Sequence, residues 1–140
     1  MRLIDLLYAI FPRGNLGRRG EAAAARYLEG QGLSILGRNF RTRSGEIDLI
    51  AREGDLLVFV EVKSRTRSER GDGFERIDFR KARRIRRAAS VYRRRLRGDL
   101  RCRIDGILVE FAPRGRGRSV PAAIRWYPAL HPFEEDGESS

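Results

Sequence analysis

Residues 45–50 read GEIDLI and residues 58–63 read VFVEVK. Both hexapeptides have the apolar, β-branched composition of a strand, yet both carry charged residues where strands usually bury apolar ones. The connecting residues 51–57 include Gly54 and have the length of a hairpin connection. The two stretches therefore predict a β-hairpin with charged groups in its interior.

The geometry of this hairpin brings carboxylates together. If the loop consists of Gly54 and Asp55, then Asp48 lies opposite Glu61, and Glu46 lies opposite Lys63. Directly opposed residues have Cβ atoms about 5 Å apart. Two carboxylates at that distance repel each other unless a cation lies between them, and Lys63 would border the same ion. The pattern predicts a metal site with hydrolytic chemistry. For Glu46, an ion pair with Lys63 or a nearby arginine is the preferred interpretation.

Lysine is rare in this chain. Of 30 basic residues only Lys63 and Lys81 are lysines, so arginine is the default positive charge. A lysine ammonium is a compact charge whose pKa shifts readily when other charges crowd it. Lys63, beside the paired carboxylates, is therefore predicted to orient or activate a water molecule.

Composition and charge limit the classes of function. The 140 residues fit one domain, and the 41% hydrophobic and 35% charged shares are typical of a soluble globular protein. The net charge of +11 predicts a polyanionic partner, with nucleic acid the default. The apolar run at residues 3–11 contains Asp5, is too short to span a bilayer and lacks a cleavage site. We therefore expect a cytoplasmic protein without a membrane partner.

Periodicity along the chain predicts the order helix, three strands, helix, two strands. The predicted helices are residues 16–29 and 76–97. The predicted strands are one that starts at residue 33, the two strands of the hairpin, and residues 102–111 and 122–127. This order predicts an α/β fold, a mixed sheet flanked by helices. We expect an N-terminal arm at 1–14, a domain at 15–130, a mobile basic loop at 64–75 and a flexible acidic tail at 131–140.

Two aromatic residues and a histidine lie at the margins of this domain. Tyr8 and Phe11 are expected either to dock the N-terminal arm or to form a homodimer interface. His131 follows the last strand, between a leucine and a proline, and is expected at the surface.

The second predicted helix is unusually basic. No acid occurs between Asp78 and Asp99, while the side opposite its apolar residues carries Arg83, Arg84, Arg86, Arg87, Arg93, Arg94 and Arg95. Like charges three and four residues apart oppose folding, and a phosphate backbone would relieve them. A nucleic-acid-binding face is favoured over a merely solvated one. The residues predicted to bind nucleic acid are Arg65, Lys81, Arg83, Arg84, Arg87, Arg94 and Arg116.

Glu21 stands on the apolar face of the first predicted helix, in register with Ala24, Ala25 and Leu28. A glutamate on such a face is costly unless it has a partner. It either belongs to the predicted site or pairs with a neighbouring arginine, Arg18 or Arg19; both interpretations remain open.

Together these residues resemble a known family. The Glu46–Asp48 and Glu61–Lys63 segments are similar to the Asp…Glu-x-Lys core of the restriction-endonuclease-like nucleases. A closer resemblance, over about residues 15 to 110, is to the YraN-like family of bacterial predicted nucleases. It is carried by Gly20-Glu21, Ala24, Leu28, Arg38-Asn39, 45–50, 58–65, Lys81 and 103–105. Ile104 departs from the usual aromatic residue of the last element.

The resemblance implies a restriction-endonuclease-like α-β-β-β-α-β core, similar to archaeal Holliday-junction resolvases. It also implies an active-site set of Glu21, Asp48, Glu61 and Lys63. The leading hypothesis is a Mg²⁺- or Mn²⁺-dependent endonuclease acting on DNA, branched structures included. Asp48, Glu61, the main-chain carbonyl of Val62 and Glu21 would be the metal ligands. The alternatives are a non-catalytic nucleic-acid-binding protein on a nuclease fold and an adaptor for an acidic protein.

Overall fold

One five-stranded mixed sheet and two helices make up the part of the chain that the structure describes. The computed structural model describes residues 12–66, 74, 78–98, 100–112 and 121–133. The elements are α2 (Pro12–Gly30), β1 (Ser34–Arg41), β2 (Glu46–Glu53), β3 (Leu56–Thr66), α3 (Phe79–Arg93), β4 (Arg101–Phe111) and β5 (Pro121–His131). The strands lie in the order β1-β2-β3-β4-β5, and β3 and β4 are parallel while the other neighbours are antiparallel. The predicted mixed α/β sheet flanked by helices is confirmed.

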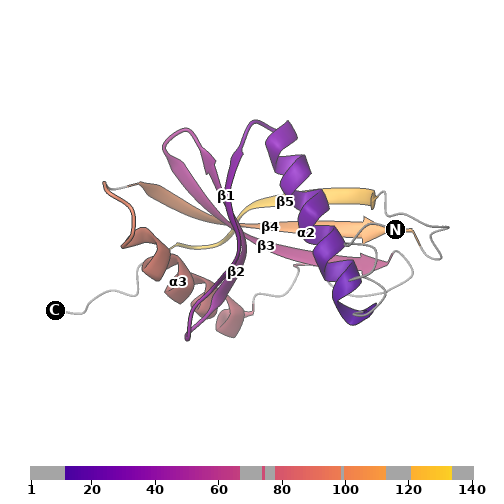
Figure 1. Cartoon of the computed structure of the whole chain (residues 1–140), viewed down its shortest axis with the longest axis horizontal. Helices are drawn as coiled ribbons and strands as arrows, with labels where there is room; N and C mark the ends of the chain where they lie inside the picture. Colours follow the sequence, from indigo (N-terminus) through magenta and orange to yellow (C-terminus); the bar gives the residue numbers. More distant parts are fainter. Residues whose placement is uncertain (1–11, 67–73, 75–77, 99, 113–120, 134–140) are drawn as a thin grey trace.

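The two helices cover opposite faces of the sheet (Figure 1). Alternate residues of β3 face opposite sides, and Val58 and Val60 pack in one apolar cluster while Leu57 and Phe59 pack in another. The first cluster includes Ala24, Ala25 and Leu28 of α2, and the second includes Ile85, Ala88 and Ala89 of α3. Since both faces are covered, β3 is buried on both sides, which explains its nearly continuous apolar run.

The hairpin has the predicted register. β2 and β3 pair from Glu53↔Leu56 to Leu49↔Val60, so the loop consists of Gly54 and Asp55. Gly54 has a φ of +55°, a conformation that glycine adopts without strain. In the described residues this pairing ends at Leu49↔Val60, one step before Asp48 and Glu61. The two carboxylates therefore lie where the strands stop pairing.

Two glycines let the helices approach the strands on either side of this point. A Cβ atom on Gly45 would clash with the main-chain carbonyl of Arg84 in α3, and one on Gly20 of α2 would clash with the Ser64 hydroxyl in β3. At Gly45 a larger residue would push the helix away, because the clashing atom belongs to the backbone, whereas at Gly20 the Ser64 side chain would have to move. These glycines therefore fix how closely α2 and α3 flank the ends of β2 and β3.

Element ends differ from the sequence-based expectations in ways that matter for the site. α2 begins at Pro12, since the fixed φ of proline suits a first helical position. α3 begins at Phe79, where Asp78 caps it by accepting hydrogen bonds from the Arg80 and Lys81 backbone N–H groups. The expectation of a loop from residue 64 is wrong for 64–66, because β3 continues to Thr66. β5 also continues beyond the predicted range, to His131.

Some predicted features lie outside the described residues. These are the arm before residue 12, the loop that carries Arg116 and the chain after residue 133. None of the helices in the described ranges combines the length and the apolar character needed to cross a membrane.

Candidate active site

A cleft of about 380 Å³ lies where β2 and β3 stop pairing, beside the first turns of α3. Its lining is strongly charged and includes both signs. The acidic residues are Glu46, Asp48, Glu61 and Asp78, and the basic residues are Arg80, Lys81 and Arg84. Asp48 and Glu61 therefore open into the same cleft, as the hairpin register predicts.

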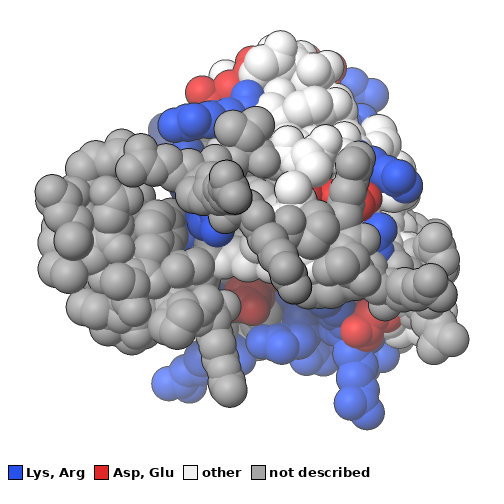
Figure 2. All heavy atoms as spheres, turned by 90° about the vertical axis from the view of Figure 1, so that its right-hand side faces the viewer, with Lys and Arg blue, Asp and Glu red and all other residues white. Residues whose placement is uncertain are grey.

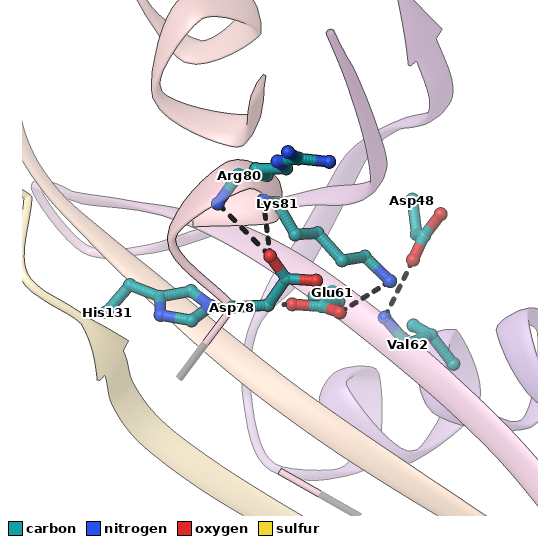
Figure 3. A network of polar contacts seen from close by, with 7 residues as sticks. All are labelled: Asp48, Glu61, Val62, Asp78, Arg80, Lys81 and His131. Carbon is teal, nitrogen blue, oxygen red and sulfur yellow. Dashed lines mark hydrogen bonds and ion pairs between the residues drawn. The ribbon is translucent and has the colours of Figure 1, made fainter. Parts of the chain in front are cut away.

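Asp48 bridges the gap between the separating strands. Its Oδ2 accepts a hydrogen bond of 2.8 Å from the backbone N–H of Val62, so the side chain is anchored to β3 (Figure 3). Burial raises the pKa of Asp48, and the charges of Glu61 and Glu46 raise it further. The Val62 N–H and the Lys81 ammonium oppose this rise in pKa. Asp48 is thus a carboxylate whose surroundings disfavour its negative charge overall.

Glu61 is buried and contacts basic groups from two other elements. Its Oε1 lies 2.6 Å from the Lys81 Nζ of α3, and its Oε2 lies 3.5 Å from the His131 Nε2 of β5 (Figure 3). Only 3% of the Glu61 side chain is exposed. A buried carboxylate is costly without such partners, so these contacts explain how the chain keeps Glu61 in the core.

The two lysines occupy different places. Lys63 continues the face of Glu61 along β3, but its Nζ lies 4.9 Å from the ring centroid of Phe74, and Lys63 is not among the cleft-lining residues. Lys81 lines the cleft and contacts Glu61. Sequence reasoning assigned Lys81 only to nucleic-acid binding. Two signals could have indicated a second role for Lys81: the scarcity of lysine in this chain, and the place of Lys81 at the start of the helix after the hairpin.

Glu21 lies on the other side of Asp48, on α2. Burial raises its pKa, and so does the negative charge of Asp48, whereas a hydrogen bond from the Asn39 side chain and the charge of Arg18 lower it. Glu21 is therefore electrostatically coupled to Asp48 but does not line the cleft. The charges of Arg18 and Asp48 thus both act on Glu21, with opposite effects on its pKa. No group of three or more His, Cys, Asp or Glu side chains within the described ranges is arranged to hold a metal ion.

The expectation that His131 lies at the surface is wrong, because only 4% of the residue is exposed. β5 pairs with β4 at Tyr127↔Gly106 and again at His131↔Ile104, so an irregularity separates the two pairs. Ala129, within that irregularity, has a φ of +54°. The two extra residues of β5 place His131 opposite Ile104, on the same face of the sheet as Phe59 and Glu61. No local pattern around a single histidine could reveal such a long-range contact.

A buried aspartate holds this end of β5 in place. Asp105 is fully buried and accepts hydrogen bonds from Arg103 Nε (2.7 Å), Arg103 Nη2 (2.8 Å), Trp126 Nε1 (2.9 Å) and the Ala129 N–H (2.9 Å). The Ala129 bond fixes the irregular backbone two residues before His131. The Arg103-Ile104-Asp105 element of the family resemblance is thus a structural clamp for the irregular end of β5.

The other predicted residues are distributed over the surface beside the cleft. Exposed α3-region arginines include Arg83, Arg84, Arg87 and Arg94. Figure 2 shows Lys and Arg side chains projecting from the lower side of the molecule, the level at which α3 lies in Figure 1.

Two predicted charges are engaged in ion pairs at this surface. Arg65 lies 3.5 Å from Glu110, so an acid already accompanies its charge. Glu46 lies 3.6 Å from Arg41, as the ion-pair interpretation of this glutamate predicts.

Comparison with known proteins identifies the family. The model of the uncharacterised protein family UPF0102 matches residues 20–109. A UPF0102 protein of Symbiobacterium thermophilum is 48% identical over 104 residues, which is 74% of this chain and 88% of the relative. A UPF0102 protein of Leifsonia xyli subsp. xyli is 48% identical over 115 residues, which is 80% of this chain and 98% of the relative. The predicted YraN-like membership is confirmed.

Proposed function

The chain belongs to the uncharacterised protein family UPF0102, and from that premise we propose that it is a metal-dependent endonuclease acting on nucleic acid, DNA first. One observation carries the proposal: Asp48 and Glu61 open into a single cleft that also contains the Lys81 ammonium. Paired carboxylates can hold a divalent cation for phosphodiester hydrolysis, and an adjacent amine can stabilise negative charge that develops on the phosphate.

The residues of the cleft fit a hard divalent cation. Magnesium prefers carboxylate oxygens and retains several waters and substrate phosphate oxygens, so two carboxylates suffice on the protein side. Asp48 and Glu61 would hold the ion, with the main-chain carbonyl of Val62 as a further ligand and Glu21 supporting Asp48 from α2. Burial and the neighbouring acids raise the pKa of Asp48, and a cation would relieve both effects. The bound metal would supply an activated water and neutralise charge on the phosphate.

Lys81 and Lys63 are proposed to have different roles in the reaction. Lys81, which lines the cleft, would stabilise the negative charge that develops on the phosphate. Lys63 lies farther along β3 on the Glu61 face, and it would orient water or contact an adjacent phosphate. This assignment differs from the sequence-based one in giving Lys81 the more direct role.

The arginine-rich face of α3 would hold the substrate. α3 contains no acidic residue, and its first turns border the cleft through Arg80 and Arg84. Such a surface binds backbone phosphates without reading base sequence. We therefore expect the protein to select substrates by the arrangement of their backbone phosphates and not by base sequence. Branched DNA is one such substrate. A cytoplasmic location and a homodimer stay predictions.

A cleavage assay tests the proposal. Duplex, single-stranded and junction DNA are incubated with Mg²⁺ or Mn²⁺ and with wild type, Asp48→Asn, Lys81→Met or Lys63→Met. Asp48→Asn should reduce cleavage by about a hundredfold or more, because it removes a charge needed by the metal. Asp55→Asn, in the exposed turn of the same hairpin, is the matched control and should cleave normally. Cleavage that survives both Asp48→Asn and Lys81→Met would contradict the site.

The second candidate function is nucleic-acid binding without catalysis. It is favoured by the Lys81 ammonium, which already contacts the buried Glu61 carboxylate in the cleft. It predicts salt-sensitive binding to DNA or RNA with no cleavage in either metal ion. Nucleic-acid affinity that is insensitive to salt would instead favour an acidic protein partner.

A further inference from the structure

We propose that Lys81 is an internal counter-ion: its ammonium holds the cation position of the cleft until a divalent metal displaces it. The inference deepens the proposed function and depends on it, because it concerns the metal of that same site. It assigns Lys81 a role before catalysis, in the metal-free protein.

The first argument is the contact between Lys81 and Glu61. The Lys81 Nζ lies 2.6 Å from Glu61 Oε1, and the Glu61 side chain is only 3% exposed. A carboxylate buried to that degree requires a compensating positive charge. A magnesium ion binds carboxylate oxygens at about 2.0–2.1 Å, so an ion on the lone pair that the ammonium now occupies would exclude the ammonium. Metal and ammonium are therefore alternatives.

The Lys81 ammonium lies near both carboxylates, Glu61 and Asp48. Lys81 lines the same cleft as Asp48 and Glu61. Figure 3 shows the Lys81 side chain reaching from α3 to the space between Glu61 and Asp48. A divalent ion shared by these carboxylates would occupy that same space.

The third argument is that Lys81 can leave while the rest of the site stays in place. Its side chain is 46% exposed, and its backbone N–H is held 3.2 Å from the capping Asp78 Oδ1. The flexible four-carbon stem can thus swing toward solvent from a fixed base. The other partner of Glu61, His131, is only 4% exposed and lies within the sheet. His131 is the fixed partner and Lys81 the exchangeable one.

Displacement would couple metal binding to substrate binding. Once released from Glu61, the ammonium would lie at the rim of the cleft with Arg80 and Arg84. A phosphate group approaching the metal would meet this positive charge there. The metal-free cleft would keep its carboxylates neutralised, and the loaded cleft would gain a phosphate-binding group.

Metal titration of the full-length chain tests this exchange without any cleavage assay. Free Mn²⁺ is measured by electron paramagnetic resonance for wild type, Lys81→Met, His131→Gln and Asp48→Asn. Lys81→Met should bind Mn²⁺ about tenfold more tightly, since its competitor is gone, whereas His131→Gln should bind about tenfold more weakly, as expected for a residue that orients a ligand. Arg83→Met, which removes a charge two residues away on α3, should change the affinity less than about twofold.

A second measurement uses the wild type, in case Lys81→Met does not fold. Lys63 and Lys81 are the only lysines, so ¹³C-lysine labelling gives two side-chain Cε signals, assigned with Lys63→Arg. Mg²⁺ should move the Lys81 signal toward the position of a free lysine and leave the Lys63 signal nearly unchanged.

Equal Mn²⁺ affinity of wild type and Lys81→Met, or an unmoved Lys81 signal at saturating Mg²⁺, would overturn the exchange. If Asp48→Asn still abolished binding in that case, the proposed metal site would stand. If neither wild type nor Lys81→Met bound Mn²⁺ at all, the exchange and the metal-dependent function would both fall.

Discussion

Asp105 and Glu61 are both buried acids, on adjacent parallel strands, yet their surroundings differ. Asp105 accepts four hydrogen bonds, from Arg103, Trp126 and the Ala129 backbone, and it lies inside the sheet-packing core. Glu61 contacts Lys81 and His131 and opens into a cleft. A fully hydrogen-bonded carboxylate stabilises one structure, whereas a carboxylate neutralised by an exchangeable cation can accept another ligand. The difference separates the structural acid from the proposed functional one.

The largest effect on stability should come from replacing the structural acid, Asp105. Asp105→Ala should lower the free energy of unfolding by about 3 kcal/mol, because it leaves the Arg103 guanidinium and the half-buried Trp126 N–H without their partner. Urea unfolding followed by circular dichroism measures the change. Asp55→Asn, in the exposed hairpin turn, should change it by less than about 0.5 kcal/mol. A comparably small loss in Asp105→Ala would mean that the clamp is not structural.

For Asp48, the proposed functional acid, we expect the opposite effect on stability: its replacement should stabilise the metal-free protein. Asp48→Asn should reduce cleavage and Mn²⁺ binding about a hundredfold while raising the metal-free Tm by about 2–4 °C, the size expected for about 1 kcal/mol. The reason is that burial and neighbouring acids disfavour its charge, whereas an asparagine oxygen can still accept the Val62 N–H bond. Differential scanning calorimetry without metal measures the Tm. A lower Tm in Asp48→Asn would show that Asp48 is structural, like Asp105.

A pH series sharpens the comparison further. Burial raises the pKa of Asp48 above its ordinary value of 3.8 and that of Glu21 above 4.5. The folded protein then holds these protons more tightly than the unfolded chain does, so metal-free stability should fall as the pH rises from these ordinary values through the raised ones. Mn²⁺ affinity should increase over the same window, because a protonated carboxylate does not bind the ion. In Asp48→Asn the pH dependence of stability should be weaker, and an unchanged profile would contradict the assignment.

The smallest effect should come from the arginine face, which contacts neither buried acid within the described part of the chain. Replacing Arg83 and Arg87 together by glutamine should weaken DNA binding and reduce the slope of log K against log salt by about 0.9 for each duplex phosphate that the variant no longer neutralises. Fluorescence anisotropy at several salt concentrations measures this slope. A matched pair of arginine replacements off α3, Arg26→Gln and Arg52→Gln, should leave it unchanged. Equal reductions from both pairs would indicate general charge attraction instead of a binding face.

Local pattern was sufficient for much of the fold. The Gly54–Asp55 loop set the hairpin register, which is confirmed as far as Leu49↔Val60. The spacing of Ala24, Ala25 and Leu28 predicted the buried face of α2, and all three are fully buried. These features could be predicted because hydrophobic periodicity and turn chemistry act over a few residues.

The site was only partly predictable for the opposite reason. Asp48 and Glu61 are brought together by a single short hairpin, so their spacing along the chain indicates their proximity in space. Lys81 and His131 reach Glu61 from a helix and a strand that join the sheet through long-range packing. No local spacing encodes those contacts.

The amino-acid sequence by itself determined that two carboxylates would face each other on a hairpin, and that a strongly basic helix would follow this hairpin in the chain. Only the tertiary structure decided which nitrogen groups contact Glu61. That choice depends on how α3 packs against the sheet at Gly45 and how Asp105 fixes the irregular end of β5. Both depend on close packing between segments distant in the chain, where burial and steric fit, not local propensity, determine the position of a side chain.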